Sequence, residues 1–224
     1  MTGPRTTKFE TTKAYDVLMA SPLILFYAFS IVGFVPKFED ARALEPWWFS
    51  ILQVASLAST VCYFALVIAL VFLRRMPVAK SHGIWPRTVA LLAANLLIVV
   101  ALLPRASLSA PALTVATVLT GGGTVAEIII LSWLGRSFTI LPEARRLVTR
   151  GPYRYLRHPL YLVSIIASIG VMMQFEQPWA FLLVTAADAL QVARLYYEER
   201  VLRDAFPEYA DYAARTWRLI PGVY

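Results

Sequence analysis

The chain has little cysteine, little charge and no nucleotide-binding glycine motif. Its single cysteine, Cys62, lies in an apolar stretch, which excludes a disulfide framework and a cysteine-based metal site, and no metal site is expected. Charged residues make up 16% of the 224 residues, whereas a soluble domain carries about 25%. No Gly-x-Gly-x-x-Gly segment follows a strand-like run, and this argues against a soluble dinucleotide-binding domain. No internal repeat or low-complexity tract is present either, so the remaining signal lies in the apolar segments.

Hydrophobic residues make up 58% of the chain, and its mean hydropathy is +0.61. Several uncharged stretches have 17 or more residues, enough for a helix to cross about 30 Å of hydrocarbon. The sequence therefore predicts an all-α, polytopic transmembrane helical bundle with five or six spans, an integral membrane protein expected in the plasma (inner) membrane. The predicted apolar segments are residues 15–36, 47–73, 88–104, 110–134, 159–174 and 178–195. No small-residue cleavage site follows the polar first 14 residues, so we expect no cleaved signal peptide.

The distribution of Lys and Arg predicts the orientation in the membrane. Alternate loops between the six segments hold 18 and 3 of the 21 positive residues. Because positively charged loops stay in the cytoplasm, both termini and the connector at 135–158 are expected on the cytoplasmic face. The same asymmetry explains the pI of about 9.7 by membrane topology, so no nucleic-acid partner is expected.

Residues 147–161 form the densest polar cluster of the chain. They hold three arginines, three tyrosines and one of the two histidines, and they run directly into an apolar span. Polar groups at the mouth of a membrane span must hydrogen-bond or bind something. We therefore interpret this cluster as part of a site rather than as a loop.

The last two spans form a hairpin that brings a second polar group to this cluster. The span that begins after His158 turns at residues 174–178, and the next span returns to the same side near Arg194. His158 and its neighbour Arg157 are thus expected beside Arg194 and the two glutamates that follow it. The returning span carries a polar stripe within an arc of roughly 140°, made of Asp188, Gln191, Arg194, Glu198 and Glu199.

The segment after Glu199 becomes amphipathic. Leu202, Phe206, Tyr209 and Tyr212 recur at helical spacing between charged residues. Pro207 is expected to begin a second short helix, because proline fits a first helical turn. The segment is compatible with two positions, as an interfacial helix that covers the site or as one that rests on lipid headgroups.

Several blocks from residue 134 onward carry a family resemblance. They are Leu134-Gly135-Arg136-Ser137-Phe138, Leu147-Val148-Thr149-x-Gly151-Pro152-Tyr153-x-x-x-Arg157-His158-Pro159-x-Tyr161, Arg194-x-x-x-Glu198-Glu199-x-x-Leu202, Tyr209-x-x-Tyr212 and the tail 218–224. In order and spacing they resemble the isoprenylcysteine carboxyl methyltransferase family of integral membrane methyltransferases. The chain departs from the family at Val163, where a glycine is usual. The resemblance divides the chain into four amino-terminal spans, 1–133, and a methyltransferase core with connector, helical hairpin and interfacial tail, 134–224.

The resemblance implies an enzyme that uses S-adenosyl-L-methionine at the cytoplasmic membrane face. Its acceptor would be a lipid-like or prenylated small molecule, such as an isoprenylcysteine, methylated on a carboxylate, and membrane lipids would surround it. The implied cofactor-binding residues are Leu147, Val148, Gly151, Tyr153, Arg157, His158, Tyr161 and Glu199. The implied catalytic residues are Arg194, which would position an anionic acceptor, and Glu198, which would accept a proton from an amine or thiol acceptor.

Some of these residues are also compatible with structural roles. His158 can cap the span that follows it, and Tyr153 and Tyr155 can belong to an interfacial belt of tyrosines. Arg136 is expected to anchor the end of the fourth span.

Three features lie outside the motifs. Glu127, deep in the fourth span, is compatible with a place in the acceptor pocket or with a hydrogen bond to Asn95 or another span. Asp188 can pair with Arg194 or line the same cavity. The glycines at 121–123 are expected to allow close helix packing.

Two other functions are compatible with parts of this pattern. An NADPH-dependent reductase of sterols or other unsaturated lipids is the main alternative, because such reductases share the Arg-His-Pro-x-Tyr block at 157–161. The paired Glu198 and Glu199 and the block at 147–153 favour the methyltransferase. A transporter or channel subunit is disfavoured, since no inverted repeat is present and the polar groups gather at one membrane face.

Overall fold

The computed structural model describes residues 13–223, most of which are helical. Arg5 and Lys8 of the amino-terminal charge count and Tyr224 of the tail motif lie outside the described residues. The helices are α1 (Lys13–Met19), α2 (Ser21–Gly33), α3 (Val35–Arg42), α4 (Trp47–Leu73), α5 (Trp85–Val100), α6 (Ala110–Leu134), α7 (Pro159–Met173), α8 (Trp179–Ala205) and α9 (Tyr209–Ala214). The connections contain the 3-10 turns η1 (Gly135–Ser137) and η2 (Gly151–Arg154) and the short strands β1 (Ala79–Lys80) and β2 (Glu143–Ala144). The predicted all-α bundle is confirmed.

The apolar segments coincide with helices. Among residues 13–223, three helical stretches are long and apolar enough to cross a membrane, namely Ser21–Arg42, Trp47–Leu73 and Ala110–Ser137. The apolar helices α5 and α7 are shorter. Helix α8 continues past the predicted apolar end at residue 195 to Ala205. Its last turns are rich in charged residues, which end the apolar pattern but not the helix, because no proline or glycine occurs before Pro207.

The first predicted span, 15–36, is divided among α1, α2 and α3 instead of forming one helix. Helices α2 and α3 each carry a proline in the first turn, Pro22 and Pro36. Proline fits a first turn but breaks a helix interior, because it lacks an N–H and its ring clashes with the preceding turn. Pro36 therefore lies at the start of a helical segment rather than at the end of the span.

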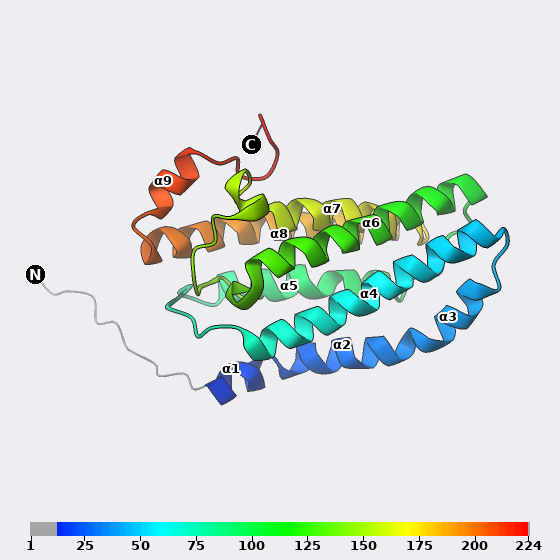
Figure 1. Ribbon diagram of the computed structural model, residues 1–224, viewed down its shortest axis with the longest axis horizontal. Helices are drawn as coiled ribbons and strands as arrows, with labels where there is room; N and C mark the ends of the chain where they lie inside the picture. The colour runs from blue at the N-terminus through cyan, green and yellow to red at the C-terminus, as the bar shows by residue number, and fades with distance from the viewer. Residues whose placement is uncertain (1–12, 224) are drawn as a thin grey trace, which may run out of the picture.

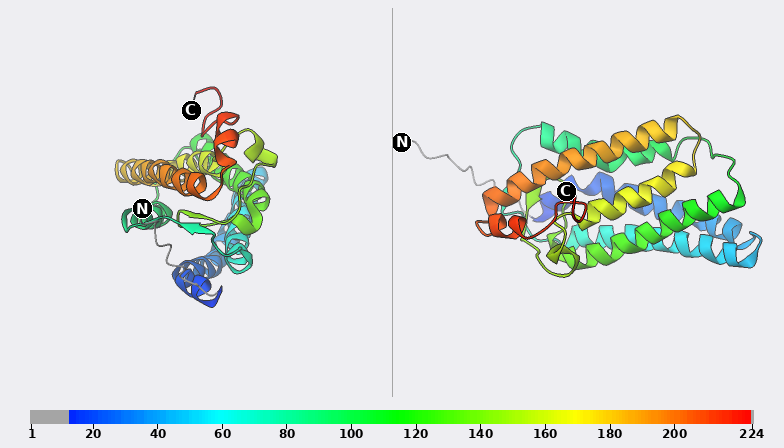
Figure 2. Two further views of the ribbon diagram at one scale, coloured as in Figure 1. Left: turned by 90° about the vertical axis from the view of Figure 1, so that its left-hand side faces the viewer. Right: turned by 90° about the horizontal axis from the view of Figure 1, so that it is seen from above.

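The long helices run side by side along the bundle (Figure 1). In the order of their contacts, α2, α4, α6, α7, α8 and α5 follow one another around it (Figure 2). Glycines allow the closest approaches. A Cβ added to Gly121 would lie 2.9 Å from the Ser56 hydroxyl of α4, and one added to Gly123 would lie 2.7 Å from Ala167 Cβ of α7. The predicted close packing is confirmed at these two positions.

The connections that the charge count assigns to the cytoplasm gather at one end of the bundle. The segments 74–84 and 135–158, and the chain beyond α8, lie at the same end as α1 (Figure 1). The connections 101–109 and 174–178 lie at the other end, where the Glu176 N–H donates to the carbonyl of Pro104 at 3.1 Å. All the candidate site residues of the sequence therefore lie toward one end of the molecule.

Buried ion pairs at this end tie α1 to the connector. Asp16 accepts hydrogen bonds from Arg74 Nε at 2.8 Å and from Arg145 Nη2 at 3.1 Å. Arg145 also donates to the Glu143 carboxylate at 2.7 Å and to the carbonyl of Arg75. Strand β2, which carries Glu143, pairs antiparallel with β1. We call Asp16, Arg74, Glu143 and Arg145 the Asp16 cluster, and it fixes the connector just before the segment that reaches the site.

Candidate functional site

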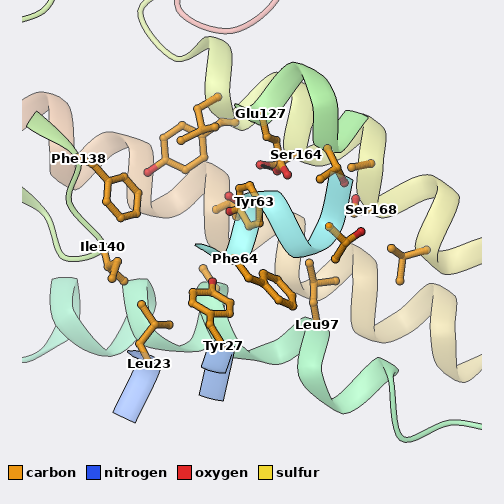
Figure 3. Close-up of a pocket in the computed structure, with 18 of the residues that line it drawn as sticks. Leu23, Tyr27, Tyr63, Phe64, Leu97, Glu127, Phe138, Ile140, Ser164 and Ser168 are labelled. Atoms are coloured by element: carbon orange, nitrogen blue, oxygen red, sulfur yellow. Dashed lines mark hydrogen bonds between the residues drawn. The ribbon is translucent and has the colours of Figure 1, made fainter. Parts of the chain in front are cut away.

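A cavity of about 730 Å³ lies between the helices. Its walls come from α2, α4, α5, α6, α7 and α8, together with the connector and α9. Figure 3 shows Leu23, Tyr63 and Glu127, from three different helices, around this space. Eight of the ten predicted site residues line it, namely Leu147, Val148, Tyr153, Arg157, His158, Tyr161, Arg194 and Glu198. The predicted hairpin therefore brings its two polar groups to one cavity.

Glu199 lies behind this wall and gathers three basic side chains. Its Oε1 accepts a hydrogen bond from Arg157 Nη1 at 2.9 Å and lies 3.3 Å from His158 Nε2. Arg218 donates to Oε1 from Nε at 3.1 Å and to Oε2 from Nη2 at 3.0 Å. Charge-assisted hydrogen bonds are short and directional. The buried Glu199 thus orients Arg157 and His158, which themselves face the cavity.

The ionisation of Glu199 follows from these contacts. It lies beyond the apolar part of α8, and its burial alone would raise the pKa of the carboxyl. Hydrogen bonds from His158 and Arg218 and the charge of Arg157 outweigh burial and lower the pKa of Glu199 to about 2. The carboxylate therefore stays charged at physiological pH.

Glu198 belongs to a separate group that faces the cavity. Its Oε1 accepts hydrogen bonds from the Tyr161 hydroxyl at 2.7 Å and from Arg194 Nε, one turn earlier in α8, at 3.0 Å. Arg194 Nη2 also donates to the carbonyl of Thr139 at 3.1 Å. The guanidinium lies 5.5 Å from the centre of the Tyr161 ring. Tyr161, Arg194 and Glu198 thus form one polar cluster, and the connector holds it through the Thr139 carbonyl. We call these three residues the Glu198 group.

Helix α9 covers the part of the cavity next to Tyr153. The Tyr212 hydroxyl donates to the Tyr153 carbonyl at 2.8 Å, and both Tyr209 and Tyr212 are buried on the cavity wall. Of the two predicted positions, the covering one is observed. The helix begins at Tyr209, and Pro207 lies in the preceding turn rather than in the helix. Burial raises the pKa of the Tyr153 phenol, so this side chain remains a neutral hydrogen-bond donor.

Two buried side-chain nitrogens on the cavity wall have no hydrogen-bond partner among the described residues. They are Nε of Arg145 and Nε of Arg157. Buried polar atoms without partners cost free energy, so a ligand that supplies partners is favoured there. Leu147 and Val148 add apolar surface to the same cavity. These residues fit a ligand with a charged amino-acid end and a flat base, as the implied S-adenosyl-L-methionine has.

Comparison with known proteins finds that part of the chain is similar to a known family. Residues 111–209 match the family model described as phospholipid methyltransferase. We call this stretch the family segment, and it covers less than half of the chain. The family segment begins in α6 and ends at the first residue of α9, so it contains the Glu198 group and the residues around Glu199, apart from Arg218.

Curated relatives each match about two-fifths of the chain. The protein-S-isoprenylcysteine O-methyltransferase B of Arabidopsis thaliana is 35% identical over 96 residues, 40% of this chain and 49% of that protein. The cobalt-zinc-cadmium resistance protein CzcN of Cupriavidus metallidurans is 38% identical over 104 residues, 42% of this chain and 46% of that protein. The matched part of the chain spans about half the length of these relatives. The predicted resemblance to isoprenylcysteine methyltransferases is confirmed.

The name of the second relative refers to metals. Within residues 13–223, no group of three or more His, Cys, Asp and Glu side chains is placed to hold a metal ion.

Two of the ten predicted site residues in the family segment do not line the cavity. One is Glu199, and the other is Gly151, whose φ of +62° favours glycine. A Cβ at Gly151 would lie 2.4 Å from the ring of Trp133. Gly151 therefore allows the chain to turn tightly against Trp133 at the start of η2, from which Tyr153 projects.

The residues that are also compatible with structural roles differ in their contacts. His158 immediately precedes α7 but makes no side-chain cap hydrogen bond, and its ring faces Glu199 instead. Arg136 lies just after α6, the fourth predicted span, and its Nε donates to the carbonyl of Leu73 at 2.8 Å, so it ties the end of this span to the end of α4. Tyr155 is exposed, as expected for a tyrosine at the interface.

The two carboxyls outside the motifs, Glu127 and Asp188, have partners on α7. Glu127 lines the cavity and accepts a hydrogen bond from Ser164. Asn95 donates to the carbonyl of Leu91 in its own helix at 2.7 Å, so the predicted Asn95 partner for Glu127 is wrong and another span supplies it. Asp188 accepts from Ser168 at 2.9 Å and does not pair with Arg194.

The tail after α9 supplies contacts that the sequence did not assign. Arg218 reaches Glu199, and its carbonyl accepts from the His158 N–H at 3.1 Å. The sequence signal for Arg218 was its place in the tail motif at 218–224. The Thr139 carbonyl that holds Arg194 is a main-chain group, so no side-chain pattern could have pointed to it.

Proposed function

We propose that this protein is an S-adenosyl-L-methionine-dependent membrane methyltransferase that acts on the carboxylate of a lipid-like or prenylcysteine-like acceptor at the cytoplasmic face. The observation that carries the proposal is the meeting of two polar groups on one cavity. Arg157 and His158, oriented by Glu199, face it beside the Glu198 group. The family segment and the isoprenylcysteine methyltransferase relatives support the same reaction class.

The cofactor side of the cavity is formed by the connector and the start of α7. Arg157 and His158 would hold the cofactor carboxylate, and Leu147 and Val148 would contact the adenine. When bound, the cofactor supplies a sulfonium methyl group that is already activated for transfer. Tyr209, with α9, closes this side against water, which such a transfer requires.

The acceptor side is formed by the Glu198 group. Arg194 would orient an acceptor carboxylate, and its contacts to Glu198 and Thr139 hold the guanidinium in one place. A carboxylate oxygen that becomes a methyl ester releases no proton, so no general base is needed. With an amine acceptor, Glu198 would take up the released proton.

Calorimetry on the purified protein tests the cofactor. We expect S-adenosyl-L-methionine or its demethylated product to bind with a Kd in the micromolar range, and NADPH not to bind. Binding of NADPH alone would favour the lipid reductase and contradict the proposal. Radiolabelled cofactor incubated with host membranes, followed by separation of lipid and protein fractions, then identifies the class of acceptor.

A further inference from the structure

The cavity extends beyond the Glu198 group and has two unlike walls. The wall from α2 and α5 is mostly apolar, and Leu23, Leu97 and the ring of Tyr27 lie along it (Figure 3). The facing wall, from α6 and α7, carries Glu127 and Ser164. An acceptor bound here would meet apolar contacts on one side and hydrogen-bonding groups on the other.

Most polar side chains on this second wall already form hydrogen bonds within the protein. Thr117 accepts from Gln53 at 2.9 Å, Thr124 donates to a carbonyl of its own helix at 2.8 Å, and Gln174 bonds to Thr120 at 3.1 Å. They need no ligand.

Glu127 differs from these neighbours. It is only 8% exposed, and among the described residues the hydrogen bond to its carboxyl comes from Ser164. A carboxyl group has about four acceptor positions, and a carboxyl in an apolar region is costly when these stay empty. The structure therefore holds a buried acceptor group at the cavity with capacity for a ligand.

The position of Glu127 relative to the Glu198 group follows from α7. Tyr161, which contacts Glu198, and Ser164, which contacts Glu127, are three residues apart on one face of this helix. Three residues rise about 4.5 Å along an α-helix. Glu127 thus lies about one helical turn further into the bundle than the group that would hold the methylated end of the acceptor.

We propose that Glu127 selects the acceptor by accepting a hydrogen bond from a hydroxyl or N–H that lies a few bonds from the methylated carboxylate. This inference rests on the proposed function and assigns the substrate class of the same cavity. The favoured acceptor is an amphiphile with an apolar chain, a terminal carboxylate and a donor group next to it. A plain fatty acid lacks this donor, so it would add no hydrogen bond to the Glu127 carboxyl.

Two probes that differ by one hydroxyl test the proposal, 3-hydroxyhexadecanoate and hexadecanoate. Calorimetry on the protein saturated with demethylated cofactor should give a Kd about tenfold lower for the hydroxy acid, because a buried acceptor that stays without a partner costs free energy. Glu127→Leu should remove this preference and leave the Kd of hexadecanoate within about twofold. Glu127→Gln, which keeps one amide oxygen and the shape of the side chain, should retain part of it.

The control is Thr124→Val, which changes a side chain on the same wall that is satisfied by its own helix. It should keep the full preference. Equal Kd values for the two probes in the wild type, or an unchanged preference in both Glu127 variants, would overturn the proposal. Failure of the proposed function would appear as absent cofactor binding. Failure of this inference would appear as equal Kd values for the two probes, which can be measured with or without cofactor.

Discussion

At the scale of single residues, Glu199 determines the arrangement of positive charge beside the cavity. Arg157, His158 and Arg218 all contact it, although they come from the connector and the tail. The guanidinium groups of Arg157 and Arg218 would repel one another here without a shared carboxylate. Glu199 is therefore a positioning residue for the cofactor side, and its own carboxylate need not touch the cofactor.

Replacing this carboxylate should weaken cofactor binding while the helices remain. Glu199→Gln keeps the shape but loses the charge that holds Arg157 and His158, so we expect the Kd for the demethylated cofactor to rise at least tenfold. Calorimetry measures the Kd, and circular dichroism measures helix content. The matched control is Glu208→Gln, an exposed position nine residues later, which should bind like the wild type. Equal affinities in the two variants would contradict the role given to Glu199.

The depressed pKa of Glu199 predicts a pH dependence with a definite sign. Because the pKa falls from an ordinary 4.5 to about 2 in the folded protein, the stabilisation is fully present above about pH 5. It is lost as the pH falls from about 4.5 toward 2. The Tm of the wild type in detergent should exceed that of Glu199→Gln by a constant amount from pH 5 to 8, and the two should converge toward pH 2. A difference that grows on acidification would contradict this.

The residues that the sequence located correctly are those that helix geometry brings together. Arg157 and Glu199 lie 42 residues apart in the chain, yet a short hairpin between two spans places them side by side. Whether a side chain faces the cavity or lies behind its wall depends on a rotation of a few tens of degrees about the helix axis. The pattern could therefore place Glu198 and Glu199 near the site but could not separate their positions.

At the scale of elements, small residues set the spacing between α6 and its neighbours. Gly123 packs on Ala167 of α7, and Gly170 of α7 packs on the backbone of α6 near Ala116. Helices in a bilayer gain little from hydrophobic burial against one another, so close packing contributes much of their association. The walls of the cavity depend on these contacts.

Adjacent glycines in α6 allow a direct test of this packing. Gly123→Ala places a Cβ 2.7 Å from Ala167 Cβ and should destabilise the protein by about 1–3 kcal/mol, as overpacking does. Gly122→Ala meets nothing within 4 Å and should be neutral or stabilise the helix by up to about 1 kcal/mol. Thermal unfolding of both variants in detergent gives the comparison. Equal Tm values would argue against close packing at Gly123.

Helix boundaries were predicted well where hydropathy changes abruptly and poorly where only the backbone changes. Helix α4 matches the predicted 47–73 because charged residues or proline flank it on both sides. The break between α2 and α3 at Phe34 occurs inside an apolar run, so hydropathy gives no sign of it. The strand pairing at Ala79–Lys80 is fixed by its partner Glu143–Ala144, which is distant in sequence.

At the scale of the whole molecule, the charge asymmetry predicts which end faces the cytoplasm. We expect a cysteine at position 208, near α9, to lie inside, and one at position 107, between α5 and α6, to lie outside. In a Cys62→Ala background, a membrane-impermeant maleimide should label Ser107→Cys in intact cells. It should label Glu208→Cys only after permeabilisation. The reverse pattern would invert the proposed orientation, and labelling of both in intact cells would contradict the three predicted crossings between the two positions.

The Asp16 cluster has a consequence for the order in which the protein is made. Asp16 precedes Arg74 by 58 residues and Arg145 by 129 residues. While the chain leaves the ribosome, this carboxylate first meets a partner when α4 has been synthesised, and its second arginine appears only after α6. The amino-terminal helices can therefore settle against the connector only late in biosynthesis, so these ion pairs link completion of the cavity to the arrival of the segment that supplies its cofactor side.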